Sequence, residues 1–102
     1  MGNFIKTVTM TSNELIAVFE GLDVTTDGIS DLYYDENGKL NKVKRYDKHW
    51  NDLMPVVAKI TRDENYWENE YREYLMDIVP YGYIEDTYEA VVEFIKWYNK
   101  KQ

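Results

Sequence analysis

The sequence predicts an α+β fold in which helices pack on a small antiparallel sheet. Apolar residues recur at helical spacing in three separated segments, and an Asn-Gly pair divides two short strand-like runs. A short apolar run before the second proline indicates one more strand. We therefore expect three helices, at about 12–20, 51–62 and 87–100. We also expect a hairpin at about 30–46 and a further strand near 75–79.

The composition is that of a folded protein. Hydrophobic residues make up 44% of the chain and charged residues 30%, which argues against a disordered segment. A chain of 102 residues can bury one modest core but not two. We expect a single domain over residues 1–102, in which residues 1–9 form an N-terminal extension.

Charge and cysteine content restrict the partners and the compartment. The formal net charge of −7 disfavours non-specific binding to nucleic acid or to anionic lipid. No apolar run approaches the roughly 18 residues of a membrane span, and the N-terminus lacks the apolar region of a secretory signal. The chain has no cysteine, as is common in a reducing compartment. We expect a cytoplasmic protein that contacts neither membranes nor nucleic acid directly.

A capping box predicts the first helix. Thr11 and Glu14 are three residues apart, so that each side chain can accept a hydrogen bond from the backbone N–H of the other. Gly21 supplies a residue suited to the left-handed end of the helix. Apolar residues at helical spacing predict one buried stripe: Leu15, Val18, Phe19 and Leu22.

The segment "DVTTDGIS" (23–30) follows as a turn-rich connection. Asp23, Thr25 and Asp27 resemble the opening of a calcium-binding EF-hand loop. However, Tyr34 stands where that loop needs a bidentate glutamate. We therefore interpret the segment as a turn and not as a calcium site.

The stretch "DLYYDENGKLNKV" predicts a hairpin that turns at Asn37 and Gly38. Its second arm opens a basic cluster with a single acid, Asp47, among its members. Lysines on an exposed edge strand discourage aggregation, and we favour this explanation over a positive patch for an acidic partner. The cluster consists of Lys39, Lys42, Lys44, Arg45 and Lys48.

The stretch "HWNDLMPVVAKI" predicts the second helix, in spite of its proline. Pro55 is tolerated in the first turn if Asn51 is the N-cap, and Trp50 would then pack against Pro55 as a hydrophobic staple. The alternative is a helix that starts at Asp47 and is kinked at Pro55. In both cases His49 lies at the helix entry. Helical spacing predicts the buried stripe Leu53, Val56, Val57 and Ile60.

Residues 63–85 allow two interpretations. One is a helix, and the other is a strand near 75–79 that ends at Pro80 and turns at Gly82. We favour a short acidic helix or loop that leads into the strand. The helical alternative would place one stripe on Trp67, Tyr71, Tyr74, Leu75 and Ile78.

The last helix is predicted from another capping box, with Asp86 as the N-cap and Glu89 three residues later. Lysines near its C-terminal end would stabilise the helix, because their positive charges lie at the negative end of the helix dipole. The residues expected to face inward are Val91, Val92, Phe94, Ile95 and Tyr98.

The sequence offers little for catalysis. His49 is the only histidine, and Asp47 or Asp52 could orient it as a general base, but no activated nucleophile accompanies it. There is no phosphate-binding glycine loop and no dinucleotide-binding motif. We therefore expect no enzyme, no cofactor, no catalytic residues and no metal site.

An aromatic and acidic segment is the candidate binding surface. Tyrosine and tryptophan make rigid amphipathic contacts at protein interfaces, and interleaved glutamates would suit a partner with a basic surface. The alternative is that the tyrosines border a small core with their hydroxyl groups in water. The candidate residues are Tyr66, Trp67, Glu68, Glu70, Tyr71, Glu73, Tyr74, Tyr81 and Tyr83.

Two stretches, "W-x-x-LMPVVxKI" (50–60) and "EAVVEFIKWYN" (89–99), carry a family resemblance. With "ELIAVFEGL" and "TDGIS", they resemble small uncharacterised proteins of bacterial viruses and mobile elements, notably those of Bacteroides-type gut bacteria. The match covers about half the chain and departs at residues 1–9 and at 63–86. The resemblance implies helices on a small antiparallel sheet and brings no known activity.

These observations predict a non-catalytic protein-interaction module of phage or mobile-element origin, acting in the host cell cytoplasm. In a sharper form, its acidic face mimics nucleic acid and inhibits a host nucleic-acid-handling or defence complex, as an anti-CRISPR-like protein would. One alternative is a small hydrolase or metal-dependent enzyme that uses His49 and nearby carboxylates. Another is a structural or assembly subunit.

Overall fold

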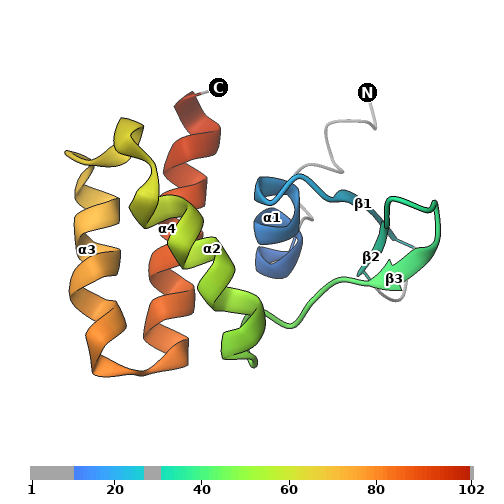
Figure 1. Ribbon diagram of the computed structural model, residues 1–102, viewed down its shortest axis with the longest axis horizontal. Coiled ribbons are helices and arrows are strands. Elements are labelled where there is room, and N and C mark those ends of the chain that lie inside the picture. Colours follow the sequence, from blue (N-terminus) through green and yellow to red (C-terminus); the bar gives the residue numbers. More distant parts are fainter. Residues whose placement is uncertain (1–10, 27–30, 102) are drawn as a thin grey trace. The chain divides into compact units, whose positions relative to one another are not determined.

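The computed structural model describes residues 11–26 and 31–101. The chain divides between Lys44 and Arg45 into two compact units. We call them the sheet unit, with one helix and three strands, and the helical unit, with three α-helices (Figure 1). This confirms the α+β class. The single domain stays a prediction, and the extension at residues 1–9 lies outside the described residues.

The first helix, α1 (Ser12–Phe19), begins and ends as its sequence predicts. The Thr11 hydroxyl accepts from the Glu14 N–H at 3.2 Å, and the Glu14 carboxylate accepts from the Thr11 N–H at 2.8 Å. At the other end Gly21 has a φ of 91°, and the Leu22 N–H donates to the Ala17 carbonyl at 3.0 Å. These bonds form a capping box and a Schellman motif.

The predicted buried stripe of α1 is wrong in phase. Ile16 and Ala17 are fully buried, whereas Val18 is 45% exposed. Leu15 is half-buried. Because the helix has only eight residues, fewer than three turns, its apolar positions surround much of its circumference and spacing alone does not single out one face.

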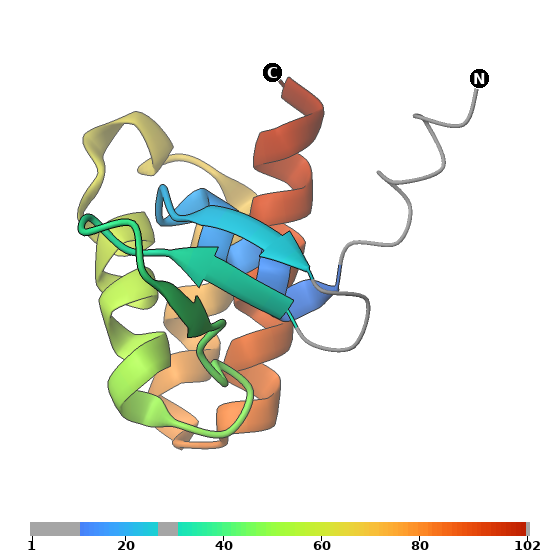
Figure 2. The same ribbon diagram turned by 90° about the vertical axis from the view of Figure 1, so that its right-hand side faces the viewer.

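Three antiparallel strands form the sheet in the order β1-β2-β3, with β2 in the centre (Figure 2). They are β1 (Asp23–Thr26), β2 (Asp31–Tyr34) and β3 (Leu40–Lys42). The predicted hairpin is thus confirmed, but residues 23–26 form a strand and not a turn. Tyr33 lies between Val24 and Asn41, which fixes the register.

The hairpin turn is organised by one carboxylate. Asp35 Oδ1 accepts from the backbone N–H groups of Asn37 and Lys39, both at 2.9 Å. Asp35 Oδ2 accepts from the Asn41 side-chain amide at 3.0 Å. Gly38 has a φ of 79°, while no described non-glycine residue has a positive φ. The loop is therefore a β-turn followed by a left-handed glycine, and not the two-residue Asn-Gly turn.

The helical unit begins with α2 (Trp50–Arg62). Its buried residues are the predicted stripe, Leu53, Val56, Val57 and Ile60. The predicted N-cap at Asn51 is wrong, because the helix starts earlier and His49 occupies the cap position with its side chain unbonded to the helix. Pro55 is therefore the sixth helical residue, inside the helix and past its first turn.

The predicted strand near 75–79 is wrong. These residues belong to α3 (Glu70–Ile78) and to the following 3₁₀ helix η3 (Val79–Tyr81). Asn69 decides the outcome, because its side chain accepts from the Tyr71 and Arg72 N–H groups at 2.9 and 3.0 Å and so caps a helix. A second 3₁₀ helix, η2 (Glu64–Tyr66), precedes α3.

The terminal helix α4 (Ile84–Lys101) starts before the predicted N-cap. Asp86 therefore lies in the first turn of α4 and is not the N-cap. Its negative charge there interacts favourably with the positive end of the helix dipole. Helices α3 and α4 run side by side, joined through η3, and α2 contacts both (Figure 1). The buried residues of α4 are Thr87, Ala90, Val91, Val92, Phe94 and Ile95, while Tyr98 is half-buried.

Candidate functional site

The predicted aromatic and acidic residues fall into three places in the helical unit. Two tyrosines pack inward against α4. Two glutamates and one tyrosine face outward on α3. The remaining residues lie in the turns at opposite ends of α3, which, with nine residues, is about 13 Å long. The structure thus brings only part of the predicted set together.

Tyr66 and Tyr71 are packing residues. The Tyr66 ring contacts Phe94 edge-on with centroids 5.0 Å apart, and it meets Tyr98 edge-on at 6.0 Å. Tyr71 lies 6.2 Å from Trp97. Burial raises the pKa of the Tyr66 hydroxyl, with a further contribution from Tyr98. Both rings therefore pack against the aromatic residues of α4.

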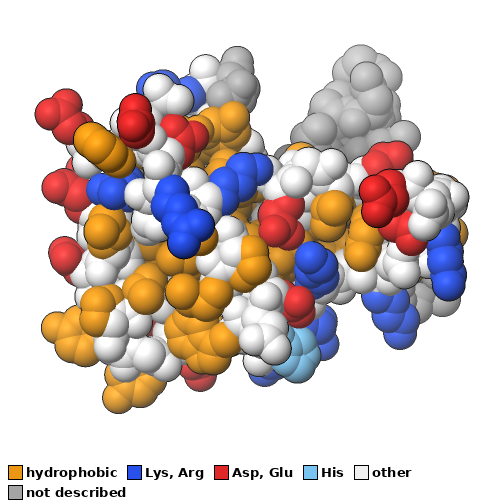
Figure 3. Space-filling view, in the orientation of Figure 1, with side chains coloured by type: hydrophobic (Ala, Val, Ile, Leu, Met, Phe, Trp, Pro, Cys, Tyr) orange, Lys and Arg blue, Asp and Glu red, His pale blue; other side chains and the backbone are white. Residues whose placement is uncertain are grey.

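Four residues share the outward side of α3, and we call them the α3 outer face: Glu70, Glu73, Tyr74 and Asp77. All four are exposed, and the side chain of Tyr74 is 53% exposed. Figure 3 shows acidic side chains along the α3 edge of the helical unit. Within the described ranges, none of these three carboxylates forms an ion pair. The face therefore carries three unpaired negative charges around an aromatic ring.

The turns at the two ends of α3 carry the other predicted residues. Trp67, which is 56% exposed, and Glu68 precede the helix. Tyr81 and Tyr83 follow it and are 73% and 63% exposed. Since these pairs lie at opposite ends of α3, they do not form a single pocket with the α3 outer face.

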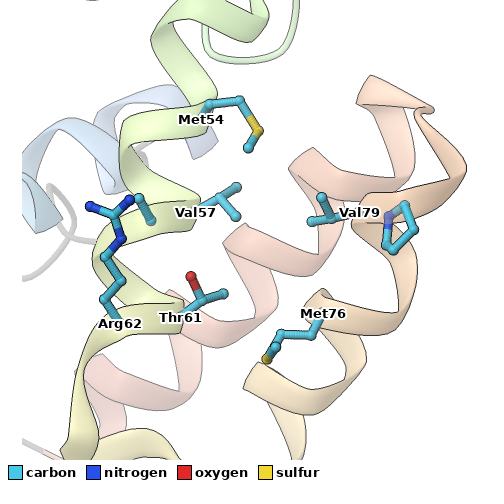
Figure 4. Close-up of a pocket in the computed structure, with 8 residues that line it drawn as sticks. Met54, Val57, Thr61, Arg62, Met76 and Val79 are labelled. Atoms are coloured by element: carbon cyan, nitrogen blue, oxygen red, sulfur yellow. The ribbon is translucent and has the colours of Figure 1, made fainter.

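An apolar groove between α2 and the α3–η3 segment was not predicted. It has a volume of about 310 Å³. Val57 and Val79 point toward one another across it, and Met54 and Met76 point into it near its two ends (Figure 4). The other lining residues are Ala58, Thr61, Arg62 and Pro80. Met54 and Met76 remain 39% and 45% exposed, so the groove is open to solvent.

A sequence signal for the groove exists on α2 alone. Met54, Ala58 and Thr61 follow one another at i, i+4 and i+7, beside the buried stripe, and so form a second and weaker stripe on the helix. The opposite wall could not be recognised from the predicted strand. In a strand, Met76 and Val79 are three residues apart and would point to opposite faces.

Arg72 fixes the two helices that form the groove. Its Nη2 and Nε donate to the Thr61 carbonyl at 2.8 and 3.2 Å, and its Nη1 donates to the Trp67 carbonyl at 3.4 Å. Thr61 lies in the last turn of α2, where backbone carbonyls lack helical partners. The guanidinium thus caps α2 from α3, a role that the sequence did not reveal.

His49, the residue of the catalytic alternative, lies at the N-cap position of α2. The residue is exposed, and its imidazole makes no hydrogen bond within residues 11–26 and 31–101. Asp47 pairs with Arg45 at 3.2 Å. A hollow of about 450 Å³ in the sheet unit is lined by Asp23, Asp35 and Glu36 among others. Among the described residues, however, no three acidic or histidine side chains are grouped so that they could hold a metal ion.

Comparison of the chain with protein-family models, with curated proteins and with solved structures finds no match. Across the described part of the chain, every helix is too short or too polar to cross a bilayer.

Proposed function

We propose that the protein is a non-catalytic interaction module that binds a partner with a basic surface through the α3 outer face. One observation carries this proposal: Tyr74 is exposed among three carboxylates that have no ion pair in the described residues. Like charges three and four residues apart destabilise a helix by a few tenths of a kcal/mol per pair. A basic partner would relieve this repulsion and bury the tyrosine ring.

The family resemblance supports a phage or mobile-element origin, and with it a partner in the bacterial host. In this form of the proposal the partner is a host nucleic-acid-handling or defence protein, whose basic surface normally contacts phosphates. The acidic spacing along α3 would then imitate a run of phosphate charges. Such binding is screened by salt, because the Debye length falls from about 10 Å at 0.1 M to about 3 Å at 1 M.

Affinity capture from a lysate of the bacterial host tests the proposal. The full chain is compared with the double variant Glu70→Lys, Tyr74→Ala, and with a matched control in the sheet unit, Glu36→Lys, Tyr34→Ala. Tyr34 is 42% exposed, close to the 53% of Tyr74. We expect a protein that the wild type and the control capture but the α3 variant does not, and whose binding weakens as salt rises.

Two outcomes would contradict the proposal. If the α3 variant captures the same protein as the wild type, the α3 outer face is not the binding surface. If binding is insensitive to salt, the partner is not held by charge, and mimicry of nucleic acid is excluded.

A further inference from the structure

The groove between α2 and α3 is a second surface, which adjoins the α3 outer face at Glu73 and Asp77. Two methionines, one on each wall, lie toward opposite ends of it, and both remain partly exposed. Methionine side chains are flexible and polarisable, and they adapt to apolar partners of different shape. Because the groove is open along one side, it suits the side chains of a macromolecule better than a small molecule, which pockets usually enclose.

The two rims of the groove carry opposite charges. On the α2 side, the Arg62 side chain reaches back along the helix at the edge of the groove (Figure 4). Within the described residues, this guanidinium has no ion-pair partner. On the α3 side, at 100° per residue, Glu73 and Asp77 lie about 60° and 100° around the helix from Met76. Both lie on the side of Met76 that is turned away from Val79. A partner that fits the groove therefore presents an acid to one rim and a base to the other.

The length of the groove indicates a helical partner. On α2 its lining runs from Met54 to Arg62, a little over two turns of helix or about 12 Å. An amphipathic helix offers apolar side chains at i, i+3, i+4 and i+7 over the same distance, and helices of this kind bind in grooves between other helices.

We propose that the groove binds an amphipathic α-helix of a partner protein, with apolar side chains inserted between Met54 and Met76. Acidic residues flank its apolar stripe on one side and meet Arg62, and basic residues flank it on the other side and meet Glu73 and Asp77. The inference rests on the proposed function, since it gives the partner with a basic surface the element that it uses.

Three synthetic peptides of about 18 residues, long enough to form a helix, test the proposal on the full chain. All carry leucine at the four stripe positions. One has glutamates on one flank and lysines on the other, one has lysines on both flanks, and one has glutamates on both. Binding is followed by fluorescence anisotropy and by the methyl NMR signals of Met54 and Met76.

We expect the mixed peptide to bind most tightly and to shift both methionine methyl signals. Arg62→Glu makes both rims acidic, so the variant should bind the mixed peptide about fivefold more weakly and the lysine peptide about fivefold more tightly, as expected for one exposed ion pair. Met54→Ser with Met76→Ser should weaken binding of the mixed peptide at least about tenfold.

Two controls separate the groove from other surfaces. Leu40→Ser removes an apolar side chain that is 46% exposed in the sheet unit and should leave peptide binding unchanged. The α3 variant Glu70→Lys, Tyr74→Ala should also leave it unchanged, although we expect this variant to lose capture from the lysate. If capture depends on Tyr74 while no peptide binds, the proposed function stands and the groove inference falls.

Other results would overturn the inference. It falls if no peptide shifts the methyl signals of Met54 and Met76, or if Arg62→Glu leaves the order of the three affinities unchanged. It falls also if these signals shift with protein concentration alone, because a second copy of the chain would then fill the groove. Shifts caused by dodecanoate and by none of the peptides would identify a site for a lipophilic acid instead.

Discussion

At the scale of single residues, Asp35 determines the geometry of the hairpin. Its carboxylate accepts two backbone N–H groups and one side-chain amide. The bond from the Lys39 N–H is the largest cause of a pKa below the usual value of the Asp35 carboxyl, and the Asn41 amide is the next. The hydrogen bonds of the folded state thus stabilise the charged carboxylate relative to the unfolded chain.

The hairpin should therefore lose stability in acid. A lowered pKa in the folded state means that the contribution of Asp35 is complete at pH above the ordinary value of 3.8 and is lost as the pH falls through the lowered pKa. We expect the amide NMR signals of Asn37 and Lys39 to titrate with a midpoint below 3.8. In Asp35→Asn this titration should vanish. A midpoint at or above the ordinary value would contradict this explanation.

Gly38 allows a second test at the same turn. A Cβ atom at this position would meet nothing within 4 Å, so a substitution there changes only the backbone preference. With a φ of 79°, we expect Gly38→Ala to lower the free energy of unfolding of the sheet unit by about 1–2 kcal/mol. Gly38→Asn should cost less, because asparagine tolerates the left-handed region. Equal stabilities of the alanine variant and the wild type, by denaturant unfolding, would refute this.

At the scale of elements, α2 contains a proline that it does not need. Pro55 is the sixth helical residue, so the Asn51 carbonyl lacks its N–H donor and faces the proline ring. Since Pro55 is exposed, its replacement leaves no cavity. We expect Pro55→Ala to raise the free energy of unfolding by about 1–2 kcal/mol.

Pro80 is the matched control for this prediction. It lies at the start of η3, where a missing N–H removes no helical bond. Pro80→Ala should therefore give no gain in thermal or denaturant unfolding. If Pro55→Ala destabilises the chain instead, the proline stabilises α2 through a contact and not in spite of its geometry.

Arg72 links α2 to α3, and its replacement should cost more stability than that of Arg62. Arg72→Gln removes two charge-assisted bonds to the Thr61 carbonyl, and we expect a loss of about 1–2 kcal/mol in the free energy of unfolding. Arg62→Gln, which breaks no bond among the described residues, should change it by less than about 0.5 kcal/mol. Equal effects of the two substitutions in denaturant titrations would show that the cap on Thr61 contributes nothing.

The elements also show how far the sequence determines the fold. The capping box of α1 and the stripe of α2 were predictable, because each depends on interactions within a few residues of the chain. Residues 75–79 were not, because "LMDIV" suits a strand or a helix and Asn69, six residues earlier, selects the helix. Similarly, β1 forms because β2 pairs with it, although its own sequence is typical of a turn.

At the scale of the whole molecule, the same limit applies to the candidate site. The sequence indicated that aromatic and acidic residues gather between 66 and 83, and the exposure of Glu70, Glu73 and Tyr74 agrees with this interpretation. Which tyrosines turn inward depends on the packing of α3 against α4. The groove required both the helical state of α3 and its place beside α2, and neither follows from local sequence.

The division into two units makes a prediction about folding. Three helices with a shared core of aliphatic residues and Phe94 lie within residues 45–102. We expect this fragment, produced alone, to keep its helical circular dichroism and to unfold cooperatively with heat. A fragment that remains unfolded until residues 1–44 are added would establish instead that the whole chain is one folding domain.

The positions of the three tryptophans have a practical consequence for such experiments. Trp50, Trp67 and Trp97 all belong to the helical unit, and the sheet unit contains none. Intrinsic tryptophan emission consequently follows the helices alone, while tyrosine signals also report on the strands. The tryptophans are thus an intrinsic optical probe of the helical unit. A difference between the tryptophan and tyrosine signals during denaturation would reveal that the helical unit and the sheet unit do not unfold together.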